Sequence, residues 1–252
     1  MEAWFISDVH VKDLRERNGQ NLLRFLHFLE TRVEELGPQQ LSLYLLGDIF
    51  DLWIADHQVF VDKYKEVIEI LQRLKSKTIK IVFIEGNHDV HIDRFFRDVL
   101  GFEVHVEAQI VYEQGLRIRI EHGDLINLQD RAYQRYRSFI RSFALRWLAH
   151  VLPGRIWLRI GERASQTSRK FSAEARNEQE GLLRNMIRQH AEKLAKDQNI
   201  DVVISGHMHV KDDVELTVGN HRIRSINLGS WLDGETPALC LRDQKFSWYF
   251  ET

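Results

Sequence analysis

The sequence predicts an α/β protein, and three observations lead to this expectation. Short apolar runs that are typical of buried strands alternate with segments of helical periodicity over the first hundred residues. This alternation is typical of parallel βαβ units. A long helical region from about residue 130 to 198 follows, and after it the chain contains short strands. We therefore expect one domain over residues 1–252 with a helical insertion at about 130–198.

The first half of the chain contains strand signals that end at polar residues and helix signals between them. Apolar residues recur at helical spacing after position 21, and Gly37-Pro38 ends that pattern. A second helical pattern precedes the third strand. The expected elements are strands over Ala3–Ser7, Leu41–Leu46 and Ile79–Ile84, and helices over Asn21–Leu36 and about Val59–Leu74.

The second half is expected to begin with a short helix near Ile92–Leu100. Three strands then follow so closely that an antiparallel meander is favoured, over Phe102–Val106, Ile110–Tyr112 and Leu116–Ile120. After the helical region, the remaining strands are Val202–Ser205, Val214–Val218, Arg222–Asn227, Ala238–Leu241 and Phe246–Phe250.

The composition is that of an ordinary globular protein, with 252 residues, 44% hydrophobic residues and a net charge of −2. The single cysteine, Cys240, cannot form an internal disulfide, so we expect a reducing compartment. The chain enters its first strand at once and has no signal-peptide pattern. The apolar segment Phe139–Ile160 is interrupted by arginines and is not expected to span a membrane. A cytoplasmic location is therefore expected.

Polar motifs stand at the ends of five expected strands: Asp8-x-His10, Asp48-x-x-Asp51, Asn87-His88-Asp89, His122 and His207-x-His209. Residues two apart in an extended segment point the same way, so each spaced pair can reach one site. Mixed oxygen and imidazole donors suit Mn²⁺, Fe or Zn²⁺ better than Ca²⁺. One such motif alone is often only a turn or a structural histidine. Five in order favour a site for two metal ions.

Such a site would carry out hydrolysis at phosphorus. Two divalent ions and two aspartates leave a formal charge near +2, which suits a phosphate or a diphosphate. A water that bridges both ions has a pKa of roughly 7 and is a hydroxide nucleophile at neutral pH. Asp48 is the residue expected to bridge the ions, because its two oxygens can bind one each.

The order of these motifs resembles that of the calcineurin-like metallophosphoesterase superfamily. The resemblance implies a fold of four layers, with two packed mixed sheets flanked by helices. It also implies one ion held by Asp8, His10, Asp48 and His209, and a second held by Asp48, Asn87, His122 and His207. The histidine matching His88 would face the phosphate, and the carboxylate matching Asp51 would orient it. His88 would act as a general acid or stabilise phosphate charge.

The insertion is expected to form a lid over this site. His122 and His207 are separated by 84 residues, more than a strand connection requires. Residues 131–170 contain nine arginines and one lysine against one acid, and they are rich in large apolar side chains. This pattern indicates an anionic membrane surface and a lipid phosphate substrate. The alternative is a packed helical cap with solvated arginines. No nucleic-acid motif is present, and nucleic acid is not an expected partner.

The resemblance is greatest to the UDP-2,3-diacylglucosamine pyrophosphatase family of lipid A biosynthesis. It is based on Gly47–Ile54, on His122-Gly123-Asp124 with Arg131-Ala132-Tyr133-Gln134, and on Leu228-Gly229-Ser230-Trp231. The best-known members carry Arg where this chain has His88 and Asp where it has Ser230. Substrate contacts are implied for Asn87, His88, Asp124, Arg131, Ser165 and Arg169.

This second resemblance implies a substrate, a metal and a location. The family cleaves a UDP-linked glycolipid into UMP and 2,3-diacylglucosamine 1-phosphate by metal-hydroxide attack, usually with Mn²⁺. The location would be peripheral, on the cytoplasmic face of the inner membrane. Two alternatives stay open: a metallophosphoesterase for another nucleotide diphosphate or phosphodiester, and a non-catalytic scaffold. A scaffold would be expected to have lost ligands, and this chain has lost none.

Overall fold

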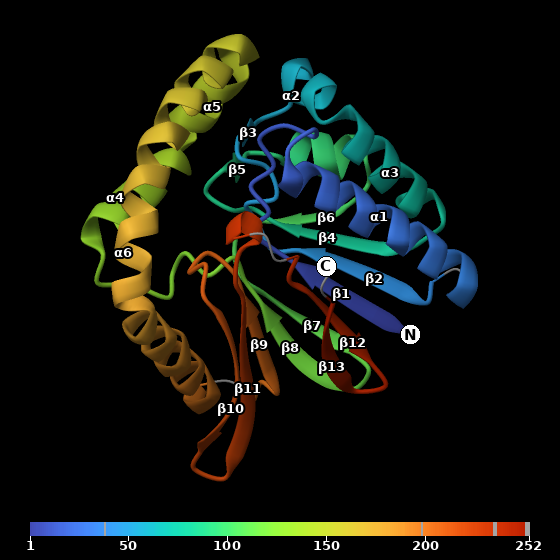
Figure 1. Ribbon diagram of the computed structural model, residues 1–252, viewed down its shortest axis with the longest axis vertical. Coiled ribbons are helices and arrows are strands. Elements are labelled where there is room, and N and C mark those ends of the chain that lie inside the picture. Colours follow the sequence, from blue (N-terminus) through green and yellow to red (C-terminus); the bar gives the residue numbers. More distant parts are fainter. Residues whose placement is uncertain (38, 198, 234–235, 250–252) are drawn as a thin grey trace.

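The structure, a computed structural model, describes residues 1–252 except 38, 198, 234–235 and 250–252, and leaves the side chains of 162–179, 197 and 233 undescribed. The described elements form four layers in which two β-sheets pack against each other and helices cover their outer faces (Figure 1). This is the four-layer α/β arrangement, with two packed mixed sheets flanked by helices, that the sequence predicts.

The first sheet has the order β13-β12-β1-β2-β4-β6. Its parallel part is β1 (Glu2–Ile6), β2 (Leu41–Leu45), β4 (Lys80–Ile84) and β6 (Glu103–His105). The strands β12 (Ala238–Arg242) and β13 (Lys245–Tyr249) are antiparallel to their neighbours. Helices α1 (Arg17–Leu36) and α3 (Lys65–Ser76) cover the outer face (Figure 1).

Side chains of β1 alternate between two cores, because successive residues of a strand point to opposite faces. Trp4 and Ile6 pack toward the helices, and Ala3 and Phe5 pack toward the second sheet. Both faces of this strand are therefore buried, which explains why its sequence is an unbroken apolar run.

The second sheet has the order β10-β11-β9-β8-β7. Its strands are β7 (Gln109–Glu113), β8 (Leu116–Ile120), β9 (Val202–Ser205), β10 (Lys211–Val218) and β11 (His221–Leu228). Its inner face packs on the first sheet through residues such as Ile118 and Ile226, which meet Phe5 and Tyr44. On its outer face, Ala191 and Leu194 of the long helix α6 (Gly154–Asp197) pack on the sheet.

The helical insertion consists of α4 (Arg131–Ile140), α5 (Phe143–Val151) and α6. The sequence predicts one uninterrupted helical region, but the chain turns twice within it. Ser142 caps α5 by accepting a hydrogen bond from the backbone N–H of Leu145 at 3.2 Å. Pro153 stands at the second turn. As a result α4 and α5 lie beside α6, which runs along one side of both sheets (Figure 1).

The expectation of a three-stranded antiparallel meander is wrong. The strand β6 pairs in parallel with β4 in the first sheet, and β7 and β8 alone form an antiparallel hairpin in the second. The π-helix η1 (Arg94–Val99) provides the crossover that a parallel β4–β6 pair requires.

Smaller differences concern local turns. The helix predicted over about Val59–Leu74 is divided into α2 (Gln58–Lys63) and α3, because Tyr64 leaves helical geometry and its hydroxyl donates to the carbonyl oxygen of Val11 at 3.0 Å. The short strands β3 (Trp53–Ile54) and β5 (Asp89–Val90) pair with each other. They are too short for a periodicity signal, as is the 3₁₀ helix η2 (Trp231–Asp233).

Candidate metal centre and cavity

The expected motifs lie at one edge shared by both sheets. Asp8, Asp48 and Asn87 follow β1, β2 and β4 of the first sheet, while His122 and His207 follow β8 and β9 of the second. These five strands run parallel within their sheets, so their carboxyl ends meet at the same edge. The structure brings all seven expected metal ligands together there.

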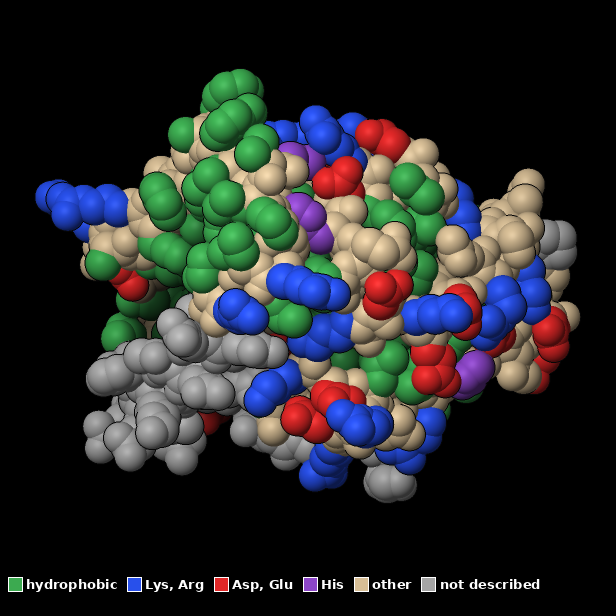
Figure 2. All heavy atoms as spheres, turned by 90° about the horizontal axis from the view of Figure 1, so that it is seen from above, with side chains coloured by type: hydrophobic (Ala, Val, Ile, Leu, Met, Phe, Trp, Pro, Cys, Tyr) green, Lys and Arg blue, Asp and Glu red, His purple; other side chains and the backbone are tan. Residues whose placement is uncertain are grey.

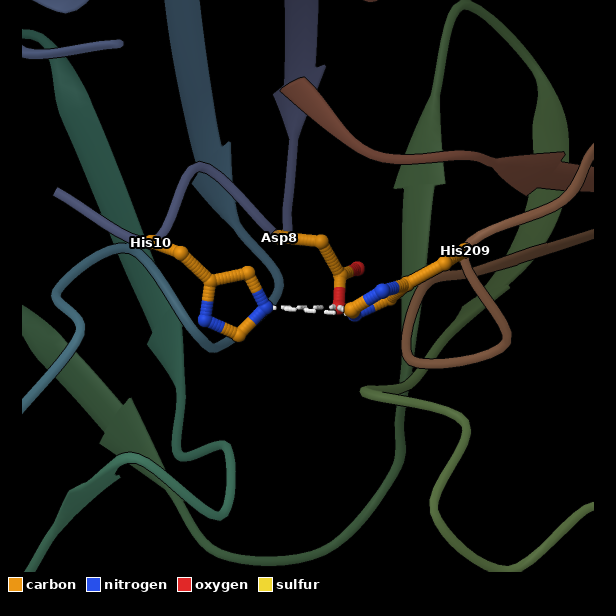
Figure 3. A group of neighbouring side chains, drawn as sticks. All are labelled: Asp8, His10 and His209. Carbon is orange, nitrogen blue, oxygen red and sulfur yellow. Dashed lines mark hydrogen bonds and ion pairs between the residues drawn. The ribbon is translucent and has the colours of Figure 1, made fainter. Parts of the chain in front are cut away.

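One group of three side chains consists of Asp8, His10 and His209 (Figure 3). Nε2 of His209 lies 3.1 Å from Oδ1 of Asp8 and 3.1 Å from Nε2 of His10. The other oxygen of Asp8 accepts hydrogen bonds from the Ser7 hydroxyl at 2.5 Å and from the N–H of His207 at 2.8 Å. Among the described atoms, Oδ1 of Asp8 is buried and accepts no hydrogen bond. A buried carboxylate oxygen that faces two imidazole nitrogens fits a cation.

A second group consists of Asp48, His122 and His207. Oδ1 of Asp48 accepts the N–H groups of Asn87 and His88, both at 2.9 Å. Oδ2 lies 3.6 Å from Nε2 of His122 and 3.8 Å from Nε2 of His10. This oxygen therefore faces both groups, as a bridging ligand must.

The ring of His122 is fixed in the form that metal binding needs. Nδ1 lies 2.9 Å from the carbonyl oxygen of Leu46 and must carry the proton, because a carbonyl can only accept. Nε2 faces Asp48, and the amide oxygen of Asn87 lies 3.2 Å away, so in the neutral ring this nitrogen is the one that can bind a metal. A second hydrogen bond of this kind orients most metal-binding histidines.

Burial lowers the pKa of His10 to about 3 and that of His207 to about 4, which keeps these two imidazoles neutral. Burial also lowers the pKa of His122, but the charges of Asp48 and Asp8 outweigh it and raise this pKa above its usual value. Burial alone would raise the pKa of Asp48, but the neighbouring imidazoles, His122 first, outweigh it and lower this pKa. Neutral imidazoles and an ionised carboxylate are the protonation states in which these groups bind metal.

Five of the seven expected ligands have left-handed backbone conformations, which are uncommon for residues other than glycine. They are Asp8, His10, Asp48, His207 and His209, with φ between 50° and 65°. The expectation that spaced pairs converge through extended backbone is therefore wrong: tight turns after the strands aim the side chains. Such conformations persist where surrounding contacts hold them, and they gather at functional sites.

Asp89 and Gly47 hold these turns in place. The Asp89 carboxylate accepts the N–H groups of Gly86, Asp48 and Ile49 at 2.8, 3.0 and 2.8 Å, and these three hydrogen bonds pin the loop. Gly47 has φ +85°, and a Cβ there would lie 2.6 Å from Nδ1 of His122. A side chain at this position would therefore displace the ring.

His88 stands beside these groups, and its Nδ1 donates to Asp51 at 2.8 Å. The acceptor is the carbonyl oxygen of Asp51, whereas the sequence resemblance implies its carboxylate. Burial lowers the pKa of His88, but the charges of Asp48 and Asp51 outweigh it and raise this pKa above its usual value. The ring centroids of His88 and His10 are 4.8 Å apart.

A cavity of about 780 Å³ opens over the candidate metal centre. Its polar part contains Asp48, Asp51, Asn87 and four histidines of the strand ends. Most of its other wall is apolar and comes from Leu52, β3, β5 and the helical insertion: Leu52, Ile54, Val90, Phe139, Ile140, Leu145, Ala149, Trp157, Ile160 and Leu183. The cavity therefore joins a charged site to an apolar chamber.

Comparison with known proteins identifies the family. The model of the calcineurin-like phosphoesterase family matches residues 1–211. The chain belongs to this family. It is 32% identical to the UDP-2,3-diacylglucosamine hydrolase of Histophilus somni over 212 residues, which cover 82% of this chain and 84% of the relative. It is 26% identical to the hydrolase of that name from Coxiella burnetii over 242 residues, which cover 96% and 94%.

This calcineurin-like phosphoesterase is a metal-dependent hydrolase, and its buried His/Asp groups are consistent with the dinuclear metal site typical of the family. A third relative with the same name, from Photobacterium profundum, is 27% identical over 246 residues, which cover 96% of this chain and 94% of the relative. Among the described helices of the phosphoesterase, none has the length and hydropathy of a membrane span.

The expected substrate contacts lie in different places. Asn87 and His88 line the cavity. Asp124 is buried and accepts a hydrogen bond from Nε of Arg137 at 2.6 Å, and Arg131 is exposed at the start of α4. The side chains of Ser165 and Arg169 lie outside the described residues. Contact of these four with a substrate stays a prediction.

Two residues of the phosphoesterase site had no role in the sequence analysis. The Tyr133 hydroxyl donates to the amide oxygen of Asn87 at 3.3 Å, and its ring lies 5.0 Å from that of His207. The sequence offers one signal for Tyr133, since this residue lies within Arg131–Gln134, one of the stretches on which the family resemblance is based. His91 lines the cavity, and its Nε2 donates to the carbonyl oxygen of Ile140 at 2.8 Å. Nothing in the sequence indicates this contact, because it joins two distant segments.

Proposed function

We propose that the chain hydrolyses the diphosphate bond of UDP-2,3-diacylglucosamine and releases UMP and 2,3-diacylglucosamine 1-phosphate. The observation that carries this proposal is the cavity, in which five of the seven candidate metal ligands and ten apolar side chains line one space. A glycolipid diphosphate needs both parts, since its phosphates require positive charge and its acyl chains require apolar walls. The name shared by the relatives supports the same substrate.

The metal part of the proposal is a pair of divalent ions, Mn²⁺ first, with Fe or Zn²⁺ as alternatives. Asp8, His10 and His209 would hold one ion and Asn87, His122 and His207 the other, with Asp48 shared. Oδ1 of Asp8 supports this assignment, because it is buried, accepts no hydrogen bond and faces the imidazoles of His209 and His10. When bound, two such ions supply an acidified water and neutralise phosphate charge.

His88 would act on the phosphate or on the leaving group. Its Nδ1 is engaged by the Asp51 carbonyl, so Nε2 is the atom that can donate to a substrate oxygen. Because His88 lines the cavity beside Asp48, a phosphate oxygen near the ions would also lie near this ring. Histidine can transfer a proton near neutral pH, which arginine cannot.

The insertion would bring the chain to its lipid substrate at the cytoplasmic face of the inner membrane. Large apolar side chains are exposed along α4, α5 and the start of α6: Phe139, Phe143, Trp147, Val151, Ile156 and Ile160. Apolar side chains gather on one side of the molecule, next to Lys and Arg side chains (Figure 2). An apolar face flanked by basic residues suits an anionic membrane surface.

The test is a comparison of three substrates with the Mn²⁺-loaded protein: UDP-2,3-diacylglucosamine, UDP-N-acetylglucosamine and bis-nitrophenyl phosphate. We expect the lipid to be cleaved about thirtyfold or more faster than the sugar nucleotide without long chains, since burial of one leucine-sized group already contributes about 2 kcal/mol. Equal rates on both UDP-sugars would contradict the lipid assignment. Cleavage of the diester without cleavage of the lipid would support a general phosphodiesterase.

Hydrolysis in ¹⁸O-labelled water identifies the phosphorus atom that is attacked. Attack on the α-phosphorus places the label in UMP. Label found in the 2,3-diacylglucosamine 1-phosphate instead would contradict the proposed reaction.

A further inference from the structure

A third group of metal-ligating side chains, His10, Asp51 and His88, stands beside the two groups described above. Its ligand atoms all lie within 4.8 Å of one another. All three side chains line the cavity, so an ion from solution can reach them. We propose that this group is a third, inhibitory site for a transition-metal ion, with Zn²⁺ as the preferred ion. The inference rests on the two-ion centre of the proposed function.

The donors fit zinc better than a harder ion. Two imidazoles and one carboxylate are a known zinc ligand set, which leaves a fourth position for water. Bonds of 2.0–2.2 Å in tetrahedral geometry place donor atoms roughly 3.4 Å apart. Donors that already lie within 4.8 Å reach this spacing through small side-chain rotations. Zn²⁺ also binds such sites more tightly than Mn²⁺ does.

The orientation of His88 favours the same conclusion. Its Nδ1 donates to the carbonyl oxygen of Asp51, so Nε2 is the nitrogen available to a metal. This hydrogen bond also keeps His88 beside the residue that carries the carboxylate ligand. The rings of His10 and His88 are nearly perpendicular, with an interplanar angle of 86° and centroids 4.8 Å apart.

An ion in this group would inhibit the enzyme for two reasons. His10 also belongs to the group of Asp8 and His209, so a third ion draws this imidazole away from the first ion, which stays bound by its remaining ligands but is held differently. The same ion binds His88, which can then no longer donate to the substrate. Repulsion by the two neighbouring dications should make this third ion bind about tenfold or more weakly than they do.

The site depends on histidine at position 88. A guanidinium has no lone pair to offer a metal and repels a cation by its fixed charge. An arginine at this position, as in the best-known members of the resembling family, would therefore remove the third site. It would leave the other two groups unchanged in composition.

The experiment is equilibrium dialysis of the full chain against rising Zn²⁺, with metal and protein counted. We expect the wild type to bind three ions, the last more weakly, and His88→Arg to bind two. Asp51→Asn should also weaken the third ion, which guards against a folding defect specific to one variant. His27→Ala is the matched control, because it removes an exposed histidine that pairs with Glu30 at 2.9 Å and does not line the cavity.

Activity on bis-nitrophenyl phosphate in excess Mn²⁺ provides the second measurement. Wild-type activity should fall over the Zn²⁺ range in which the third ion binds, and the activity of His88→Arg, whatever its starting level, should not fall there. Three results would each overturn the proposed third site. The wild type could bind only two ions, His88→Arg could retain the third ion, or His27→Ala could lose it. Fewer than two ions would instead overturn the two-ion centre and with it the proposed function.

Discussion

Asp212 fastens the last part of α6 to the second sheet, and its removal gives a measurable prediction. Its carboxylate, 3% exposed, accepts hydrogen bonds from Nη1 of Arg184 at 2.8 Å and from Nε and Nη2 of Arg188 at 3.0 and 2.9 Å. The two arginines are one helical turn apart, so one carboxylate on β10 fixes both the position and the rotation of the helix. Asp212→Asn keeps the size of the side chain and removes its charge.

The expected magnitude follows from the burial of the partners. Breaking a buried ion pair costs about 3–5 kcal/mol, and an exposed pair contributes about 0–1 kcal/mol. Here the acid is buried, but the side chains of Arg184 and Arg188 are 35% and 40% exposed and can be rehydrated. We therefore expect a loss of about 2 kcal/mol in the free energy of unfolding. For a chain of this size, the melting temperature should fall by roughly 4–8 °C.

The loss should depend on pH in a defined direction. Burial raises the pKa of Asp212, but hydrogen bonds from Arg188 and Arg184 outweigh it and hold this pKa below its usual value. A lowered folded-state pKa contributes stability that is fully present above the unfolded pKa of about 3.9 and is lost as the pH falls through the folded-state pKa. The difference between wild type and Asp212→Asn should therefore be complete at pH 7 and shrink below about pH 4.

Hydrogen exchange followed by mass spectrometry is the assay, because it reports on α6 separately. A loss of about 2 kcal/mol corresponds to roughly thirtyfold faster exchange of amides after residue 180. Asp213→Asn is the matched control, since Asp213 pairs with Arg224 between β10 and β11, at 2.8 and 2.9 Å. Unchanged exchange in α6 of Asp212→Asn, or equal acceleration in both variants, would refute the anchoring role.

Three further predictions concern the metals, the membrane and the acid. Asp48→Ala should lose both ions because Oδ2 of Asp48 faces both groups, whereas His10→Ala should keep partial metal occupancy. If metal analysis finds two ions on Asp48→Ala, Asp48 does not bridge the ions. The double variant Phe143→Ser/Trp147→Ser should bind anionic vesicles more weakly than the wild type. Wild-type binding should also fall as salt is added, because salt screens exposed charges beyond ~8 Å. Co-sedimentation with vesicles measures both effects, and an unchanged result would favour the packed helical cap. His88→Ala should lower turnover roughly 10²–10⁴-fold on substrates with poor leaving groups and much less with nitrophenolate; equal losses would show that His88 only stabilises charge.

The strand ends could be predicted from the sequence because their signal is local. Each expected ligand follows an apolar run, and parallel strands end at one edge of a sheet, so Asp8 and His122 are placed without knowledge of the turns. The turns themselves could not be predicted. Asp8 has φ 51°, and the contacts that hold it include the N–H of His207, which is 199 residues away in the chain. The pairing of β6 with β4 was missed for the same reason, since register depends on distant partners.

The insertion shows a second limit, because its charge could be counted from the sequence but not assigned to a face. Arg137 pairs with Asp124, Arg146 pairs with Asp93 at 2.7 Å, and Arg141 donates to the carbonyl oxygens of Glu85 and Gly86 at 3.2 Å each. These arginines fasten the insertion to the loops of the metal centre. Their charges are therefore paired within the protein and attract a lipid surface less than unpaired arginines would.

The positive charge that the insertion presents to solvent is consequently smaller than the net charge of +9 that the sequence shows for residues 131–170. Among the arginines of this segment whose side chains the structure describes, four are exposed, at positions 131, 135, 155 and 159. At about 1 kcal/mol for each basic residue near an anionic membrane, these four would contribute roughly 4 kcal/mol. That is too weak for stable attachment without the apolar side chains of α5, so membrane binding by this chain should need both kinds of contact.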